Sequence, residues 1–252
     1  MNYLIGDIGN TSLKICKINN KFRIVKTFLF RTKSVYLEKN LKKKINQLAK
    51  NNTCNKILFS SVVPHIYRKI DKIFRKKNFK IFEIKKFGLN KLLKFKVKRY
   101  SQLGSDRIAN AIGAYYKFKT NCIVIDFGTA TTFDVIKKPG MYDGGVITPG
   151  IALSIENLFS STALLPTFKL KKYPTNYGKN TKEALNSGFF WGYQGLINNI
   201  VKKIIKKNNK NFKIILTGGY SNLFKDKIFK QATIEKDITI QGILKVYRKF
   251  LI

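Results

Sequence analysis

The 252-residue chain carries 50 Lys and Arg against 13 Asp and Glu, for a formal net charge of +37, and 44% of its residues are hydrophobic. This apolar content excludes intrinsic disorder, and the length suits one compact unit or two small lobes. No apolar stretch is long enough to span a bilayer, and the start MNYLIGDIGN does not read as a secretory signal. We therefore expect a cytoplasmic protein with no membrane partner.

The positive charge has two interpretations. A charge of this size is typical of nucleic-acid-binding proteins. However, most of the excess is lysine spread over the whole length together with Asn, Ile and Phe, a bias that an AT-rich genome would also produce. Because Arg and aromatic residues are not interleaved on one element, we favour the second interpretation and expect at most nonspecific binding to nucleic acid.

The three cysteines, Cys16, Cys54 and Cys122, show no metal or disulfide pattern. Their number is odd, no CxxC spacing occurs, and they lie in or beside apolar, strand-like stretches. We predict reduced thiols in the core.

The first half of the chain predicts three strands followed by alternating helices and strands. Apolar runs and period-two alternation indicate the strands, whereas apolar spacings of three and four with lysines opposite indicate the helices. Pro64 stands at a plausible first helical position. In chain order, the predicted elements are strands over 3–6, 13–18 and 22–30, a helix over 36–50, a strand over 56–63, a helix from Pro64 through Phe74 and a strand over 79–84.

The second half repeats this order after a helix from Gly104 through Phe118. The stretches CIVIDF, TTFDVI and DGGVIT restart the three-strand pattern, and helices and one further strand follow. The later elements are helices over 151–159 and 180–207, a strand over 212–219 and a C-terminal helix that carries Ile240, Ile243, Leu244, Tyr247 and Leu251. We predict two lobes, residues 1–118 and 119–252, joined by a short hinge.

An apolar strand followed by Asp-x-Gly-Asn/Thr occurs twice, at Asp7 and at Asp126. Gly9 permits a tight turn whose backbone amides can approach an anion, and the hydroxyls that follow add donors for phosphate. A carboxylate beside a phosphate makes sense if a cation such as Mg²⁺ lies between them. A single copy would be ordinary turn chemistry, but two copies in equivalent places favour a grip on a triphosphate from two sides.

Two further stretches could contribute to a site. In YSQLGSDRIANAIG, Ser105 or Asp106 falls near a helix N-terminus, where Asp is either a plain cap or a base beside an anion site. ILTGGYS ends a strand in two glycines, which lets the backbone approach a flat ligand. The DFG triplet does not indicate a protein kinase, because HRD and GxGxxG are missing, as is the P-loop pattern, and the single His65 has no zinc-ligand partners.

Taken together, these motifs resemble those of the type III pantothenate kinase family. The motifs run in order along the whole chain: DIGNTSLK, GSDR, DFGTATTFD, GGVITPG, KNTKEAL and LTGGYS. The resemblance implies an α/β fold of two duplicated ribonuclease H-like lobes, as in actin-like ATPases, with a nucleotide cleft between them. It also implies a homodimer, phosphorylation of pantothenate by ATP, and a need for Mg²⁺ and a monovalent cation, K⁺ or NH₄⁺.

The resemblance assigns roles to individual residues. Asp106 matches the catalytic base, Asp126 the monovalent-cation ligand, and Asp7 lies near magnesium. The expected ATP-binding residues are Asp7, Ile8, Gly9, Asn10, Thr11, Ser12, Leu13, Lys14, Thr129, Gly218 and Gly219. The expected pantothenate-binding residues are Tyr100, Gly104, Ser105, Asp106, Arg107 and Thr181.

These residues imply transfer of the γ-phosphoryl group of ATP to pantothenate, the first step of coenzyme A biosynthesis. Arg107 would stabilise either the transferring group or the pantothenate carboxylate. Two alternatives stay open at this point. One is a non-catalytic relative with a regulatory or nucleic-acid-binding role, as reported for Bvg accessory factors, and the other is a kinase for a different small hydroxyl substrate.

Overall fold

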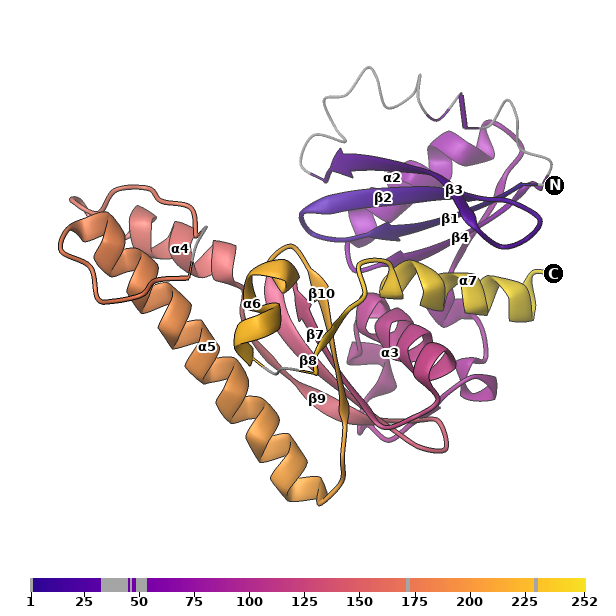
Figure 1. Ribbon diagram of the computed structural model, residues 1–252. Coiled ribbons are helices and arrows are strands. Elements are labelled where there is room, and N and C mark those ends of the chain that lie inside the picture. Colours follow the sequence, from indigo (N-terminus) through magenta and orange to yellow (C-terminus); the bar gives the residue numbers. More distant parts are fainter. Residues whose placement is uncertain (1, 33–44, 46, 49–53, 171–172, 229–230) are drawn as a thin grey trace. The chain divides into compact units, whose positions relative to one another are not determined.

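The computed structural model describes residues 2–32, 45, 47–48, 54–170, 173–228 and 231–252 (Figure 1). The chain divides into two compact units, Met1–Lys117 with Asp237–Ile252, and Phe118–Lys236. The predicted bounds of 1–118 and 119–252 differ from this division at the C-terminus, since residues 237–252 return to the first unit. The predicted helix over 36–50 lies largely outside the described residues, although Ile45 and Leu48 are helical and buried.

The first unit is built on a sheet with strand order β3-β2-β1-β4-β5. The first three strands pair antiparallel, whereas β1, β4 and β5 run parallel, so their carboxyl ends share one edge. The strands of this sheet are β1 (Tyr3–Ile8), β2 (Ser12–Ile18), β3 (Ile24–Arg31), β4 (Lys56–Ser61) and β5 (Lys80–Glu83). The short strand β6 (Lys94–Phe95) is not part of this sheet.

Helices cover both faces of this sheet. Helix α2 (Pro64–Arg75) connects β4 to β5 and buries Ile66, Ile70 and Phe74 against Leu4, Ile57 and their neighbours. The segment after β5 contains the short 3₁₀ helices η2 (Ile84–Lys86), η3 (Leu89–Lys91) and η4 (Tyr100–Gln102), and then α3 (Ser105–Phe118).

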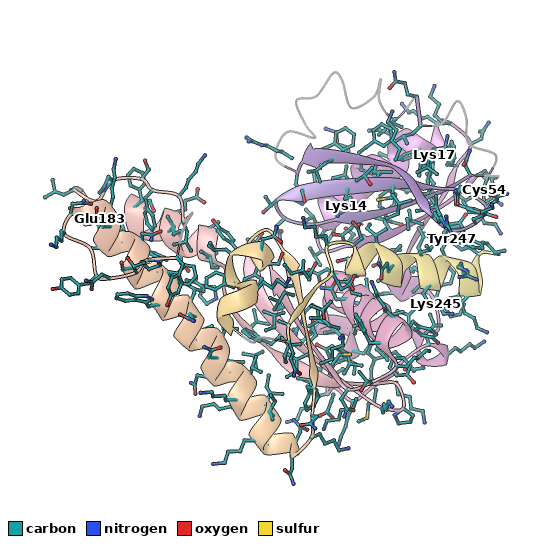
Figure 2. The ribbon with its side chains drawn as sticks, in the orientation of Figure 1. Lys14, Lys17, Cys54, Glu183, Lys245 and Tyr247 are labelled. Atoms are coloured by element: carbon teal, nitrogen blue, oxygen red, sulfur yellow. The ribbon has the colours of Figure 1, made fainter. Side chains whose placement is uncertain are left out.

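The C-terminal helix α7 (Ile238–Phe250) lies beside α3 and packs on β1 and β4 (Figure 1). The Tyr247 hydroxyl donates to the Lys56 carbonyl at 3.0 Å and lies 3.1 Å from the Cys54 sulfur (Figure 2). A Cβ on Gly242 would collide with the backbone of Ala109, so only glycine permits this close approach of α7 and α3. These contacts explain why the C-terminal segment belongs to the first unit.

The second unit repeats the plan, with its strands in the order β11-β10-β7-β8-β9. Strands β7, β8 and β9 form an antiparallel meander, and β10 and β11 extend it in parallel with β7. The elements are β7 (Cys122–Phe127), β8 (Ala130–Lys137), β9 (Met141–Pro149), α4 (Ile151–Ser160), α5 (Thr181–Asn208), β10 (Lys213–Gly218), α6 (Ser221–Ile228) and β11 (Thr233–Ile234). The predicted duplication is therefore confirmed at the level of topology.

The core and the cysteines also follow the prediction. The second unit buries Ile123, Ile125 and Phe133 against α5 and α6 residues such as Phe190 and Phe224. Cys16, Cys54 and Cys122 are free and buried. Among the described residues, no helix has the length and apolar character of a membrane span.

Candidate active site

The turn after β1 is held in shape by its own backbone and by Thr32. The Gly9 amide donates to the Ser12 carbonyl at 2.9 Å. The Thr32 hydroxyl donates to the Gly9 carbonyl at 2.7 Å, and its amide donates to the Thr11 carbonyl at 2.9 Å. Asn10 and Thr11 at the tip are exposed. The exposed tip of the turn is therefore accessible to a ligand, while hydrogen bonds hold the base of the turn in place.

Asp7 has polar neighbours on both adjacent strands. In register, it lies opposite Lys14 on β2 and Ser60 on β4, so the three side chains project from one face of the sheet. The Lys14 ammonium also lies 3.5 Å from Asp237, just before α7 (Figure 2). Ser60 is fully buried, and its hydroxyl has no hydrogen-bond partner within the described part of the chain. This face therefore combines a carboxylate, an ammonium and an unused hydroxyl.

Asp106 lies in the first turn of α3. One of its carboxylate oxygens accepts a hydrogen bond from the Arg107 amide at 2.8 Å. Burial raises the pKa of the Asp106 carboxyl, and the Arg107 amide and guanidinium offset part of that rise. A Cβ on Gly104 would collide with the Asp106 carboxylate, so the glycine of GSDR makes room for that side chain. Asp106 is thus a half-buried carboxylate with an elevated proton affinity.

The Asp7 turn and the Asp106 segment belong to the same edge of the first sheet. The Val62 amide, directly after β4, donates to the Ile8 carbonyl at the end of β1 at 3.1 Å. A Cβ on Gly104 would lie 3.6 Å from the Val62 side chain. Both predicted groups therefore gather around the carboxyl ends of β1 and β4, as expected for ligand sites of α/β sheets.

Glu83 and Lys85 join this edge although the sequence analysis assigned them no role. The Ser105 hydroxyl donates to the Glu83 carboxylate at 2.5 Å, and the Lys85 ammonium donates to the Ser101 and Leu103 carbonyls at 2.8 and 3.0 Å. The only available signal was a Glu at the end of the apolar strand FKIFEI, which does not reveal a partner 22 residues further on.

The second unit brings its own predicted residues together. The Gly219 amide donates to the Phe127 carbonyl at 3.1 Å. Gly218 has a φ of +85°, and a Cβ there would lie 2.7 Å from the Asp126 carboxylate. Thr129, Gly218 and Gly219 are exposed at this edge. The carboxylate and nearby carbonyls form an oxygen-rich set, which hard cations prefer.

Thr181 is the first residue of α5 and is exposed. At the helix start, the Asn180 side chain caps the helix by accepting from the Glu183 amide, and the Glu183 side chain accepts from the Lys179 amide, each at 3.0 Å. Figure 2 labels Glu183 at this helix start. A role of Thr181 in substrate binding stays a prediction.

Solved structures define the class of protein first. A Campylobacter jejuni protein whose name assigns it to the Baf family of transcriptional activators matches with a TM-score of 0.62 and 22% identity, covering 98% of each chain. The activator of 2-hydroxyisocaproyl-CoA dehydratase from Clostridium difficile matches with a TM-score of 0.55 and 10% identity over 99% of this chain and 95% of that one. The chain therefore has the fold of two duplicated ribonuclease H-like lobes found in actin-like ATPases and sugar kinases.

Sequence comparisons then identify the family. The family model for type III pantothenate kinase matches residues 3–203. A type III pantothenate kinase of Pelagibacter ubique is 48% identical over 244 residues, 96% of this chain and 97% of the relative. Another, from Desulfosudis oleivorans, is 34% identical over 247 residues, 95% of this chain and 96% of the relative. This chain belongs to the type III pantothenate kinase family.

Proposed function

We propose that this chain transfers the γ-phosphoryl group of ATP to pantothenate, giving ADP and 4'-phosphopantothenate, the first step of coenzyme A biosynthesis. Family membership supports this reaction. The structural observation that carries the proposal is the position of Asp106, which lies in the first turn of α3 at the sheet edge that also bears the Asp7 turn.

We assign Asp106 as the catalytic base. The primary hydroxyl of pantothenate attacks the γ-phosphorus, its proton passes to the Asp106 carboxylate, and the bond from phosphorus to the ADP oxygen breaks. The raised pKa of Asp106 increases its affinity for that proton. Because the transition state of phosphoryl transfer is loose, aiming the hydroxyl matters as much as accepting its proton.

We further propose that the Asp7 face holds the phosphates and a hydrated Mg²⁺. Its Asp7 carboxylate and the buried, unused Ser60 hydroxyl are oxygen groups of the kind that bind Mg²⁺ and its water shell. When bound, Mg²⁺ neutralises charge on the phosphates. Lys14 adds positive charge on the same face, and the amides and hydroxyls of Asn10 and Thr11 donate to phosphate oxygens.

In the second unit we assign Asp126 to the monovalent cation, K⁺ or NH₄⁺. The oxygen-rich surroundings of its carboxylate support this assignment, because K⁺ takes oxygen ligands and NH₄⁺ donates hydrogen bonds to them. We assign Thr129, Gly218 and Gly219 to ATP, since the two exposed glycines leave the backbone open to a flat ligand.

We assign Tyr100, Gly104, Ser105, Arg107 and Thr181 to pantothenate. Arg107 supplies a guanidinium directly after the base, suited to the pantothenate carboxylate or to the charge on the transferring group. The Tyr100 hydroxyl is buried with no partner among the described residues, so it has a free donor for a polar ligand.

We propose that the chain forms a homodimer through α4 and the segment that follows it. Among the described residues of the second unit, the exposed large apolar side chains lie mostly on α4, the segment after it and the first half of α5, with Ile147 on β9 as the exception, and exposed apolar surface is typical of interfaces. These residues are Leu153, Leu158, Phe159, Leu164, Tyr173, Tyr177 and Trp191.

Charge favours a second copy of the chain as the partner. Residues 139–168 contain no Lys or Arg, although the chain has 50 of them in total. Two copies with a charge of +37 repel each other over most of their surface. Between residues 139 and 168, this face adds no positively charged side chain to that repulsion.

Light scattering coupled to size exclusion tests the dimer. We expect the wild-type protein to elute with the mass of two chains and Leu158→Asp to shift toward the monomer. Leu29→Asp, at an exposed leucine of β3 in the first unit, is the matched control and should leave the dimer intact. A monomeric wild-type protein, or equal effects of both substitutions, would contradict the proposal.

A coupled assay of ADP release tests the activity itself. We expect release that depends on pantothenate in the presence of ATP, Mg²⁺ and K⁺. Release with a different hydroxyl acceptor in place of pantothenate would indicate another small-molecule kinase. No release with any acceptor would favour the non-catalytic alternative.

A further inference from the structure

Glu83 connects three elements at the active-site edge of the first unit. It is the last residue of β5, and its carboxylate accepts from the Ser105 hydroxyl at 2.5 Å and from the Lys85 amide at 2.8 Å. The backbone of Ser61, at the end of β4, also hydrogen-bonds to it. The carboxylate therefore ties the ends of two parallel strands to the N-terminus of α3.

Lys85 fixes the chain just before α3. Its ammonium donates to the carbonyls of Ser101 and Leu103, at 2.8 and 3.0 Å, and lies 5.9 Å from the centre of the Tyr100 ring. These contacts hold η4 and the turn after it, which contain residues assigned above to pantothenate. Glu83 and Lys85 thus hold opposite ends of the stretch that leads into Asp106.

Burying the Glu83 carboxylate costs desolvation energy, which indicates that this side chain does more than fill space in the core. Burial raises the pKa of Glu83, and its hydrogen bonds offset only part of that rise. A half-buried carboxylate is therefore kept at a position where an apolar side chain would avoid the desolvation cost. The carboxylate contributes orientation: its hydrogen bond fixes the position of the Ser105 side chain, one residue before the base Asp106.

Glu83 is not a second base. Three hydrogen bonds already engage its carboxylate. By contrast, the hydrogen bonds to the Asp106 carboxylate come from the backbone amides of Arg107, at 2.8 Å, and of Asp106 itself. An error of about 1 Å in the position of a reacting group can cost roughly a hundredfold in rate. A side chain that sets the position of Ser105 therefore bears directly on turnover.

We propose that Glu83, supported by Lys85, is a positioning residue that aims the Asp106 carboxylate at the hydroxyl of pantothenate through its bond to Ser105. This inference rests on the proposed function and adds to it two residues that neither touch the substrate nor take part in proton transfer.

The test compares Glu83→Leu, which has no acceptor oxygen, and Ser105→Ala with the double variant, so that the same hydrogen bond is removed from each of its two ends. The control is Asp71→Asn, which removes a partly exposed carboxylate of α2 that pairs with Arg75 at 2.8 Å. We would measure kcat and KM for pantothenate and for ATP in the ADP-release assay, together with thermal unfolding.

We expect each single variant to lower kcat/KM for pantothenate by about 10- to 100-fold, with the KM for ATP within about twofold of wild type. The double variant should lose no more than the worse single variant, because both changes break one interaction. Asp71→Asn should match the wild type. If Glu83→Leu fails to fold, Ser105→Ala alone carries the comparison.

Three results would overturn the inference. One is wild-type turnover in both single variants. Another is additive losses in the double variant, and the third is an equal rise in the KM for ATP accompanied by a lowered melting temperature, which would indicate a general structural role. A wild-type enzyme inactive toward pantothenate would instead refute the proposed function, and this inference with it.

Discussion

Replacing Asp106 by Asn separates catalysis from stability. The Asn side chain has nearly the same shape, and its carbonyl oxygen can still accept the hydrogen bond that the Arg107 amide makes at 2.8 Å. What the substitution removes is the negative charge and the second acceptor oxygen. The space above Gly104 that admits the carboxylate also admits the amide.

The expected effects on rate and on stability have opposite signs. Loss of a general base lowers turnover by about 10²- to 10⁴-fold, so at least about 2.7 kcal/mol of transition-state stabilisation should disappear. The pKa of Asp106 is raised in the folded protein by burial, so the folded state binds its proton more tightly than the unfolded state does. The free energy of unfolding therefore falls as the pH rises from the unfolded-state pKa through the folded-state pKa. At neutral pH, the charged Asp106 carboxylate destabilises the folded protein.

The assay pairs steady-state ADP release with denaturant unfolding at neutral pH. We expect kcat to fall by at least about a hundredfold while the free energy of unfolding stays equal to that of the wild type or rises. Asp71→Asn serves again as the control, with both quantities unchanged. Normal turnover in Asp106→Asn would refute its assignment as the base, and a large loss of stability would refute the electrostatic argument.

Three further outcomes are expected. Replacing K⁺ and NH₄⁺ by Na⁺ should depress kcat in the same assay, and indifference to the cation would count against the role of Asp126. Gly218→Ala should raise the KM for ATP and cost about 1–3 kcal/mol in unfolding experiments, because φ is +85° and the new Cβ would lie 2.6 Å from the Phe127 carbonyl; an unchanged KM and stability would contradict this geometry. Tyr247→Phe should cost about 1 kcal/mol, measured by denaturant unfolding, through the lost bond to Lys56 with kcat unchanged, and no loss would mean that the bond adds nothing.

Local sequence patterns were sufficient to predict the strands that precede the Asp7 and Asp126 turns. The alternation from Leu13 to Ile18 and the apolar run before Asp126 predicted strands that the structure confirms, because burial on a sheet imposes those periods directly. The glycine of GSDR was predicted to belong to the site, and its structural reason is the carboxylate of Asp106 packed against it.

Contacts between residues far apart in the sequence could not be predicted from local patterns. The C-terminal helix was assigned to the second lobe because it follows it in the chain, whereas Tyr247 and Gly242 pack it onto the first unit. Glu83 was read only as part of a strand, since nothing nearby in the sequence indicates its bond to Ser105. In both cases the contact that decides the arrangement joins residues far apart in the chain, and the spacing of apolar residues along the sequence does not indicate such a contact.

Mass spectrometry of the reaction products tests the central claim most directly. Incubation of the purified protein with ATP, Mg²⁺, K⁺ and pantothenate should yield 4'-phosphopantothenate in amounts equal to the ADP formed, and the Asp106→Asn variant should yield almost none. ADP without any phosphorylated pantothenate, or equal product from the wild type and the variant, would contradict the account.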